Sequence, residues 1–514
     1  MKAITVRNLK VNIGTGGMLT EAVRGADLTL ERGEILVLAG ESGSGKTIFC
    51  KSIASLLPRG ASASADELTV CGRTAIVLQD PLTSLDPTLT IGRQLAEAAS
   101  IHNPKLTAKE LEARAVELLA AVGIERAEER AALYPDNFSG GMRQRVVIAM
   151  ALAGEPDILL ADEPTTALDV TVQDEILKLL TGICRSRGMS LLFVTHDLSV
   201  AETISDRIAV MHEGKIIECG PASEVLTSPK EEYTRRLISA TRIDKHEAFE
   251  PGDVILDVRG LSHTFRLSRR ERLTAVKNVS FELRKGEILG IVGESGSGKS
   301  TLLRCLLNLY EIQDGSVIYK GIHTEDKDEH RANRRLLQAD RQIILQDSAA
   351  ALNPRMMVQD IITEPLKLQG RMTPRGSYRK EAIFQLSYVG MSSEYAERYP
   401  KALSGGQRQR VAIARALTMD PGLLLCDEAV SSLDMQVQRQ VIELLRHMRD
   451  EHGCSIIFVT HDLRAARMLC DRIAVMKAGE IVETGSSEDV FERPESEYTK
   501  KLISAMPGGS SNDQ

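Results

Sequence analysis

Long apolar runs are missing from this sequence of 514 residues. No stretch approaches the 18 or more consecutive apolar residues of a membrane-spanning helix, and the best runs, such as residues 288–292, suit buried strands. Met1 leads into the strand-like residues 4–6 and not into the apolar core of a signal peptide. We therefore expect neither a secretory leader nor a membrane span.

The sequence also lacks cysteine pairs at metal-binding spacing, and it has no excess of basic residues. None of the eight cysteines is spaced as C-x-x-C, so neither a zinc nor a redox site is indicated. The formal net charge is −7, unlike the overall basic character of many nucleic-acid binders. With 43% apolar and 26% charged residues, a chain of this length predicts a globular protein of two or more domains.

The sequence instead contains an internal repeat. The segment GESGSGKT at residues 40–47 recurs as GESGSGKS at residues 293–300. Three further motifs recur in the same order: Ser-Gly-Gly at 139–141 and 404–406, Asp-Glu at 162–163 and 427–428, and Thr-His-Asp at 195–197 and 460–462. The repeat predicts two copies of one domain.

These copies set the expected boundaries. We expect a first domain at residues 1–241, a linker at 242–252, a second domain at 253–506 and a disordered tail at 507–514. The second copy has 14 more residues than the first between its Gly-rich segment and the glutamine that follows it, which is Gln79 in the first copy and Gln346 in the second.

Each copy alternates apolar runs with amphipathic segments. In the first copy, residues 35–39, 158–160 and 191–194 are typical of buried strands, residues 47–57 of a helix, and residues 208–217 of a hairpin. Thr107 and Glu110 form a capping-box pattern ahead of a further helix. This alternation predicts an α/β fold with a largely parallel central sheet.

The Gly-rich segment lies between a predicted strand and a predicted helix. Glycines there let backbone N–H groups converge on phosphate at the helix N-terminus, the lysine reaches the β- and γ-phosphates, and the following hydroxyl binds Mg²⁺. The predicted nucleotide-binding residues are Gly40, Glu41, Ser42, Gly43, Ser44, Gly45, Lys46 and Thr47, and Gly293, Glu294, Ser295, Gly296, Ser297, Gly298, Lys299, Ser300 and Thr301.

Carboxylates follow a second apolar strand in each copy. Asp162 and Asp427 end these strands beside the expected phosphates, where each can hold Mg²⁺ through water. Glu163 and Glu428 follow directly, and each can orient or deprotonate the attacking water. The alternative, a surface Asp-Glu pair, does not explain why a mostly apolar run precedes it in both copies.

In each copy, two further polar residues follow apolar strands. His196 and His461 are predicted γ-phosphate sensors, although a lone histidine is usually structural. Gln79 and Gln346 can contact both the metal and the attacking water, with a solvated loop glutamine as the alternative. The predicted metal-binding residues are Thr47, Gln79, Asp162, Ser300, Gln346 and Asp427.

The Ser-Gly-Gly motif begins another predicted helix, with Met142 and Gln407 as the first residues after it. A helix N-terminus of this kind is a second phosphate-binding element. The residues are Ser139, Gly140, Gly141, Ser404, Gly405 and Gly406.

This ordered set, with Ala167-Leu168-Asp169, resembles the ATP-binding-cassette family over nearly the whole chain. The resemblance implies two P-loop NTPase domains, each with a mainly parallel sheet core, an antiparallel β part and a helical subdomain. It also implies ATP and Mg²⁺ as cofactors and head-to-tail cassettes. Each ATP would then lie between the Gly-rich loop of one cassette and the Ser-Gly-Gly of the other.

Within the family, the sequence is similar to a fused pair of peptide/nickel import ATPases. The segments 138–145 and 162–169 and the Tyr-Thr pairs at 233–234 and 498–499 carry this likeness, and segments 346–355 and 427–434 are closest to the nickel type. The likeness implies two separate permease subunits, a solute-binding protein and a peripheral position on the cytoplasmic face of the inner membrane. Nickel or a metal chelate is the first expectation for the solute, with di- or oligopeptides second.

Tandem cassettes also occur in ATPases that act on ribosomes or nucleic acid. The ribosome-associated ATPases usually have a long charged helical linker, and the ATPases that act on nucleic acid have zinc-binding insertions. This sequence has neither feature. The basic run of Arg266, Arg269, Arg270 and Arg272 has no interleaved aromatics, which favours a solvated loop and no nucleic-acid contact.

One departure from the family concerns the adenine. The family stacks an aromatic ring on the base at a position that Phe265 matches in the second copy and Ile13 in the first. We therefore expect the first site to bind ATP more weakly. The alternative is that Ile13 is a core strand residue and that another side chain covers the base.

Overall fold

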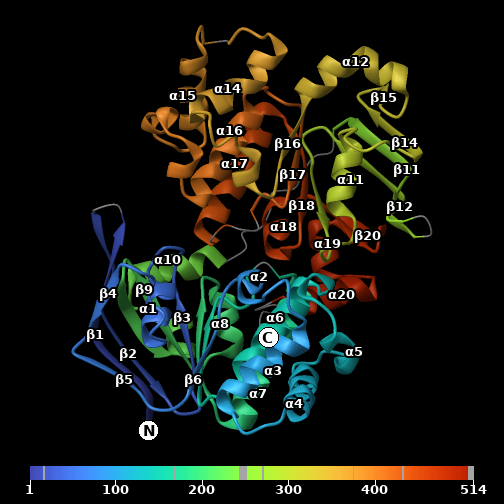
Figure 1. Ribbon diagram of the computed structural model, residues 1–514. Coiled ribbons are helices and arrows are strands. Elements are labelled where there is room, and N and C mark those ends of the chain that lie inside the picture. The colour runs from blue at the N-terminus through green and yellow to red at the C-terminus, as the bar shows by residue number, and fades with distance from the viewer. Residues whose placement is uncertain are drawn as a thin grey trace. The chain divides into compact units, whose positions relative to one another are not determined.

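The computed structural model describes residues 1–15, 18–166, 168–241, 252–268, 271–373, 375–430, 433 and 435–506. They form two compact units, Met1–Arg242 and Ile243–Met506, with a similar order of elements (Figure 1). Residues 242–251 of the predicted linker and the predicted tail, 507–514, lie outside the described residues. So do Ala167, Arg269 and Arg270 of the motifs discussed above.

A six-stranded sheet forms the centre of each unit. The strand orders are β10-β9-β3-β8-β7-β6 and β16-β17-β18-β13-β19-β20, and only the terminal hairpins β9-β10 and β19-β20 are antiparallel. The predicted strands and the predicted hairpin are confirmed. The strands are β3 (Ile35–Ala39), β6 (Thr74–Val77), β7 (Ile158–Asp162), β8 (Ser190–Thr195), β9 (Arg207–His212), β10 (Lys215–Pro221), β13 (Ile288–Val292), β16 (Arg341–Ile344), β17 (Leu423–Asp427), β18 (Ser455–Thr460), β19 (Arg472–Lys477) and β20 (Glu480–Ser486).

A smaller antiparallel sheet packs over one face of the first unit's central sheet, with helix α1 (Lys46–Ile53) between them. One apolar cluster joins the three layers, from Ile4 through Phe49 to Leu192. The second unit repeats this arrangement with α11 (Lys299–Leu306). The strands of these sheets are β1 (Lys2–Thr15), β2 (Met18–Glu31), β4 (Ala61–Ser64), β5 (Glu67–Val70), β11 (Val254–Arg266), β12 (Arg272–Arg284), β14 (Asp314–Tyr319) and β15 (Ile322–His323).

Helices cover the opposite face of the central sheet and form the helical part of each unit. The first unit has α2 (Pro81–Ser84), α3 (Ile91–His102), α4 (Ala108–Ala121), α5 (Ala127–Ala131), η1 (Pro135–Asn137), α6 (Gly140–Leu152), α7 (Val170–Arg187), α8 (Leu198–Ile204), α9 (Ala222–Thr227) and α10 (Glu232–Thr241). The second has α13 (Ser348–Ala351), α14 (Val358–Gln369), α15 (Tyr378–Tyr388), η2 (Ser393–Glu397), η3 (Pro400–Ala402), α16 (Gly405–Leu417), α17 (Met435–His452), α18 (Leu463–Leu469), α19 (Ser487–Glu492) and α20 (Glu497–Ser504).

Three predicted helix starts differ from the structure, and one feature agrees fully. The helices after Ser-Gly-Gly begin at Gly140, not Met142, and at Gly405, not Gln407, because the serine itself caps each helix, so both glycines lie in its first turn. The helix predicted at 47–57 spans Lys46–Ile53. The capping box is present, since Thr107 accepts from the Glu110 N–H and the Glu110 carboxylate accepts from the Thr107 N–H. No helix among the described residues is long and apolar enough to cross a membrane.

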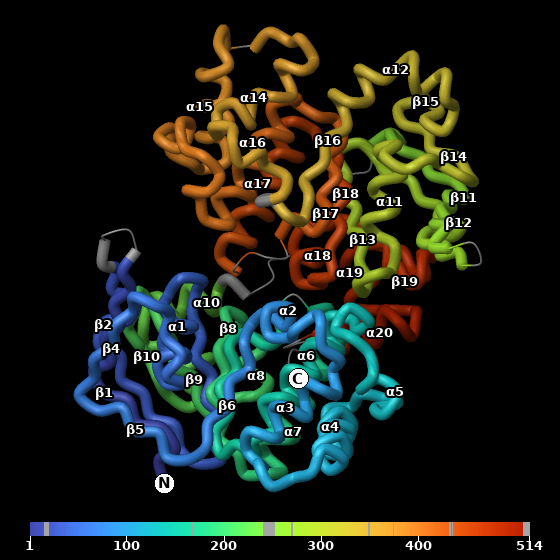
Figure 2. Tube along the Cα trace, viewed as in Figure 1, coloured from blue at the N-terminus to red at the C-terminus, as the bar shows by residue number. Residues whose placement is uncertain are grey.

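The extra residues of the second copy build a helix of their own. After β14 the chain forms β15 and then α12 (Lys327–Asp340) before it reaches β16 (Figure 2). In the first unit, β5 leads to β6 without a helix. Because this insertion lies before β16, it leaves the carboxyl edge of the second unit's sheet unchanged, and the segments after β13, β16, β17 and β18 meet there as those after β3, β6, β7 and β8 do in the first unit.

Candidate active site

The Gly-rich loop connects β3 to α1 through backbone that only glycine accepts. Gly45, the N-cap of α1, has a φ of 104°, and a Cβ on Gly40 would lie 2.3 Å from the Met211 carbonyl oxygen. Gly298 and Gly293 repeat this in the second unit, with a φ of 104° and an approach of 2.1 Å to the Met476 carbonyl oxygen. The loop therefore leads directly into a helix N-terminus, which favours bound phosphate.

The lysine of the loop is buried inside it. Lys46 is 4% exposed, and its Nζ donates to the Gly40 carbonyl at 2.8 Å and to the Glu41 carbonyl at 2.7 Å. Lys299 is also 4% exposed and donates to Gly293 and Glu294, both at 2.8 Å. A buried ammonium group in the concavity of a phosphate-binding loop supplies positive charge where β- and γ-phosphates are expected.

A hydroxyl and a carboxylate converge beside the loop. The Thr47 hydroxyl donates to Asp162 at 3.0 Å, and the Ser300 hydroxyl donates to Asp427 at 2.7 Å. The pKa of Asp162 is raised, first because the carboxyl is buried and further because Glu163 is adjacent; the Thr47 hydrogen bond opposes the shift. A hydroxyl oxygen beside a carboxylate is a pair of hard oxygen ligands, a donor set that fits Mg²⁺.

The next residue, Glu163, has a strained backbone and three side-chain partners. Its φ is 47°, and its N–H donates to the Val194 carbonyl of β8 at 3.0 Å, which fixes this conformation. Gln79 Nε2 at 3.1 Å, the Thr166 hydroxyl at 3.0 Å and His196 Nδ1 at 3.3 Å all reach Oε2. Among the described residues these contacts fall on one oxygen, which leaves Oε1 to accept a proton from water.

Electrostatics keep this glutamate charged. Burial, the largest influence, would raise the pKa of Glu163, but the hydrogen bond and charge of His196, with Lys46 and Thr166, lower it below its ordinary value. Burial likewise opposes the charged form of His196, yet its pKa is raised because Glu163 accepts its hydrogen bond. A carboxylate that is ionised at neutral pH can act as a general base.

The second unit repeats the arrangement around Glu428. Its φ is 49°, Gln346 Nε2 lies 2.7 Å from Oε2, and His461 Nδ1 lies 3.3 Å from the same atom. The pKa of Glu428 is also lowered, against the effect of burial, by His461 and Lys299. Each unit thus brings the predicted glutamate, glutamine and histidine together, from the ends of three parallel strands.

The Ser-Gly-Gly residues lie at the N-terminus of α6 and of α16. The Ser139 hydroxyl accepts the Met142 N–H, and the Ser404 hydroxyl accepts the Gln407 N–H, both at 3.3 Å. Phe265 lies near the end of β11, partly exposed, with its ring edge-on to His263 and Tyr310. Ile13 has the corresponding place on β1 and is partly exposed as well, which disfavours its assignment as an enclosed core residue.

Tyr233 and Tyr498 also contact the loops, and the sequence did not identify them as site residues. The Glu41 N–H donates to the Tyr233 hydroxyl, and the Glu294 N–H to the Tyr498 hydroxyl, each at 3.2 Å. Their recurrence 265 residues apart, in step with His196 and His461, was the available signal. It points to a shared role but not to the loop as the partner.

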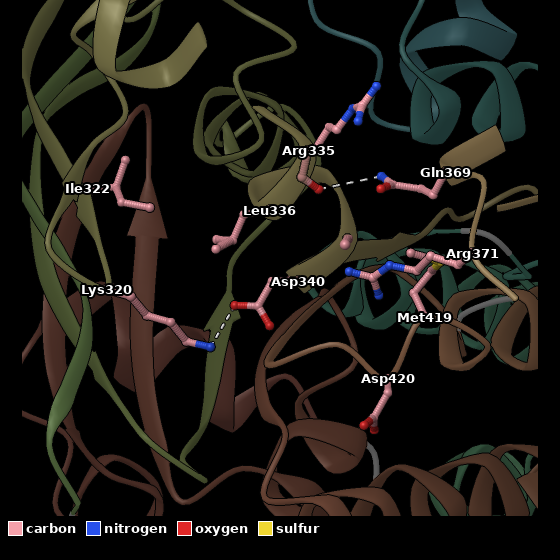
Figure 3. Close-up of a pocket in the computed structure, with 10 residues that line it drawn as sticks. Lys320, Ile322, Arg335, Leu336, Asp340, Gln369, Arg371, Met419 and Asp420 are labelled. Carbon is pink, nitrogen blue, oxygen red and sulfur yellow. Dashed lines mark hydrogen bonds and ion pairs between the residues drawn. The ribbon is translucent and has the colours of Figure 1, made fainter. Parts of the chain in front are cut away.

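A hollow of about 620 Å³ lies elsewhere in the second unit, between α12, the end of α14 and the end of α16 (Figure 3). Lys320, Arg335, Asp340, Arg371 and Asp420 contribute charges to its lining, and Lys320 pairs with Asp340 at 2.6 Å. It contains none of the predicted site residues. It lies where β17 begins, at the edge of the sheet opposite the Gly-rich loop.

Two domains of this fold, each with a phosphate-binding loop, a hydroxyl-carboxylate pair and a buried glutamate, define a tandem nucleotide-binding ATPase. Comparison with known proteins supports this class. The ABC transporter family profile matches residues 23–166 and 276–431, and the profile of the oligopeptide/dipeptide transporter C-terminal region matches residues 482–514.

Curated relatives span the whole chain. The glutathione import ATP-binding protein GsiA of Salmonella choleraesuis (strain SC-B67) is 38% identical, over 98% of this chain and 89% of its own. The peptidoglycan transport ATP-binding protein YejF of Agrobacterium fabrum is 39% identical, over 98% and 96%. A solved structure, cbiO1 from Clostridium perfringens, is 27% identical over 49% of this chain and 94% of that chain, with a TM-score of 0.41.

The chain belongs to the ABC transporter family. It is the ATP-binding, ATP-hydrolysing subunit of an importer, which confirms the resemblance inferred from the sequence. The alternative of a tandem-cassette ATPase for ribosomes or nucleic acid is not favoured.

Proposed function

We propose that the chain uses ATP hydrolysis to import a small peptide or a peptide-like solute. The observation that carries this choice is the match of residues 482–514 to the oligopeptide/dipeptide transporter C-terminal region. Relatives that import glutathione or transport peptidoglycan support the same chemical class. Nickel or a metal chelate, the first expectation from the sequence, stays the competing prediction for the solute.

The test measures two solutes in one strain. Deletion of the gene should abolish uptake of a radiolabelled dipeptide or tripeptide and leave uptake of radiolabelled nickel unchanged. Re-expression of the chain should restore uptake, and re-expression of the Glu163→Gln, Glu428→Gln double variant should not. Lost nickel uptake with intact peptide uptake would move the assignment to nickel.

Each cassette supplies the metal-binding and water-activating residues of one hydrolytic centre. Mg²⁺ would be held by Thr47, Gln79 and Asp162 in the first cassette and by Ser300, Gln346 and Asp427 in the second. When bound, it neutralises charge on the phosphate oxygens. The amide nitrogen of Gln79 donates to Glu163, so the amide oxygen is the atom that would bind the metal. Glu163 Oε1 accepts the proton of the attacking water while His196 holds Oε2.

We also propose that each ATP is shared between the cassettes, as the family resemblance implies. Lys46, Asp162 and Glu163 then act with Ser404-Gly405-Gly406, and Lys299, Asp427 and Glu428 act with Ser139-Gly140-Gly141. Backbone N–H groups at the start of α6 or α16 would complete the γ-phosphate site.

Double substitutions distinguish shared sites from separate ones. Under sharing, Lys46→Ala with Ser404→Arg damages one site, and the chain still binds one ATP. Lys46→Ala with Ser139→Arg damages both sites, and bound ATP falls toward zero. Equilibrium dialysis with labelled ATP counts the nucleotides, and the reverse order of the two variants would mean that each cassette forms its site alone.

The expected partners are two integral membrane permease subunits and a solute-binding protein, on separate chains. The chain would then lie peripherally on the cytoplasmic face of the inner membrane, held by the permeases. Co-expression with the permeases should shift the chain into the membrane fraction, and high salt or urea should release it. A chain that sediments with ribosomes under both conditions would contradict this location.

A further inference from the structure

Each Gly-rich loop is bonded to a tyrosine from the far end of the same cassette. The Glu41 N–H donates to the Tyr233 hydroxyl, across 192 residues of sequence, and the Glu294 N–H donates to the Tyr498 hydroxyl, across 204. Neither hydroxyl belongs to the metal or water-activating groups. The contact occurs in both cassettes at the same distance, 3.2 Å, so it is a shared feature of the two sites.

The tyrosine rings are themselves fixed by the terminal hairpin of the sheet. In the first cassette the Tyr233 ring stacks on His212, the last residue of β9, with ring centroids 3.8 Å apart. In the second cassette the Lys477 ammonium group, at the end of β19, lies 4.7 Å from the centroid of the Tyr498 ring. The residue under the ring differs, but the ring is supported in both cases.

The helices that carry the tyrosines are anchored where they begin. Glu218 of β10 accepts the N–H groups of Lys230 at 2.8 Å and Glu231 at 3.2 Å, just before α10. Glu483 of β20 does the same for Glu495 and Ser496, at 2.8 and 3.0 Å, before α20. Thr234 and Thr499, the next residue after each tyrosine, are 0% and 2% exposed. The tyrosine therefore projects from a packed support.

The same hairpin also bonds to the loop directly. The Gly214 N–H donates to the Ser44 carbonyl, and the Gly479 N–H donates to the Ser297 carbonyl, both at 2.9 Å. Lys46 in turn donates to the Glu41 carbonyl. The Glu41 residue is thus held at its N–H by Tyr233 and at its carbonyl by Lys46, which fixes the first turn of the loop from both sides.

We propose that Tyr233 and Tyr498 are positioning residues that hold the Gly-rich loops in the phosphate-binding shape, a contact we call the tyrosine clamp. The proposal rests on the ATP sites proposed above. Phosphate binds to loop N–H groups, so a loop held in shape before binding loses less conformational freedom when ATP arrives. The ABC transporter profile matches up to residues 166 and 431, before either tyrosine, and Tyr498 lies in the oligopeptide/dipeptide C-terminal region. The clamp gives that region a role in nucleotide affinity.

Tyr233→Phe and Tyr498→Phe test the clamp, because each removes one hydroxyl and keeps the ring on its support. In the full chain, loss of a neutral hydrogen bond should raise the ATP and ADP dissociation constants of the affected site about 2- to 10-fold. KM for ATP should rise with them while kcat changes less than about 2-fold, since the catalytic carboxylates are untouched. In the absence of nucleotide, hydrogen–deuterium exchange of peptides containing Glu41 or Glu294 should be faster in the matching variant than in the parent chain.

Tyr378→Phe is the matched control. The Tyr378 hydroxyl donates to the Arg371 carbonyl, beside α14 and α15. The substitution therefore removes the same chemical group at a place away from the loop. KM and loop exchange should stay at the parent values. Unchanged KM and unchanged loop exchange in both clamp variants would overturn the proposal. A lower melting temperature with unchanged KM would do the same, because it marks a purely structural role. Failure of the parent chain to bind ATP would instead refute the proposed function.

Discussion

The two cassettes agree closely where phosphate chemistry is expected and differ around it. The hydroxyl-carboxylate distances are 3.0 Å in the first and 2.7 Å in the second, the glutamine-glutamate distances 3.1 and 2.7 Å, and both histidine-glutamate distances 3.3 Å. Both glutamates have positive φ. In both copies the glutamate must meet a glutamine and a histidine from a backbone of positive φ, which tolerates little change, so both copies keep the same residues.

The side predicted to bind the base shows the clearest difference. In the second cassette His263, Phe265 and Tyr310 form an aromatic cluster, with His263 stacked on Tyr310 at 5.3 Å between centroids. The first cassette has Val11 and Ile13 at the places of His263 and Phe265. Phosphate groups need the same donors in both copies, whereas an aliphatic side chain can cover a base as well as an aromatic one, with a smaller gain, so the residues predicted to contact the base can differ.

A second difference lies in the Ser-Gly-Gly helix. In the second cassette the Gln407 side chain accepts the Ser404 N–H at 3.0 Å and completes a capping box. Met142 has no oxygen with which to do this, and its sulfur instead lies 3.8 Å from an Arg130 guanidinium nitrogen. The start of α6 therefore has one fewer capping interaction than the start of α16.

The largest expected effect comes from the glutamates. Glu163→Gln and Glu428→Gln should each bind ATP but lower single-turnover hydrolysis at their own site by about 10²–10⁴-fold, the usual contribution of an acid–base group. Because the two glutamates have the same surroundings, we expect losses of similar size. Rapid-quench assays measure them, and normal single-turnover rates in either variant would remove that glutamate from the mechanism.

The next effect comes from the lysines. Lys46→Ala and Lys299→Ala should each lower steady-state ATPase activity severely, by about 10²-fold, because a preorganised positive charge at the phosphates is lost. Lys109→Ala, at an exposed position of α4, is the control and should retain activity. Near-normal turnover in either loop variant would argue against sites that depend on each other.

A smaller effect should separate the two cassettes. Phe265→Ala should weaken ATP binding at the second loop by about 5-fold or more, since stacking on a base contributes about 1–3 kcal/mol. Ile13→Tyr should strengthen binding at the first loop and increase its preference for adenine over guanine. ATP and GTP titrations of the full chain measure both. The prediction would be wrong if the parent chain bound ATP more tightly at the first loop than at the second and Ile13→Tyr gave no further gain.

The smallest effect is a shift in pH dependence. Glu163, whose pKa is lowered, stays charged above its ordinary pKa and loses its charge as pH falls through the lowered value. The His196 charge that assists it is complete below the ordinary histidine pKa and is lost as pH rises through the raised value. His196→Asn removes this assistance, so the pKa of Glu163 rises and the acidic limb of single-turnover hydrolysis moves to higher pH.

Two comparisons sharpen that result. His461→Asn should move the acidic limb of the second site in the same direction, because His461 lowers the pKa of Glu428. His102→Asn, at the end of α3, should leave both limbs in place. An acidic limb that stays at the parent pH in the His196 variant would mean that the contact with Glu163 does not control its ionisation.

The sequence by itself determined the two cassettes, the chemistry of each loop and the carboxylates that follow β7 and β17. These depend on local rules: glycine spacing fixes a loop ahead of a helix, and an apolar run that ends in Asp-Glu puts carboxylates at a strand end. Helix limits were less certain, as the starts at Lys46 and Gly140 show, because capping by a neighbour decides them. The family and its transport role also followed from these motifs.

Only the tertiary structure decided which of these residues touch. Glu163 has a positive φ, and its Oε2 contacts bring together residues that follow β6, β7 and β8. The tyrosine clamp brings α10 to the loop that follows β3. The extra residues of the second copy became α12, which no short motif indicated. Such contacts depend on the order in which parallel strands pack side by side, and that order is set by the burial of whole sheets and helices, not by any local stretch of sequence.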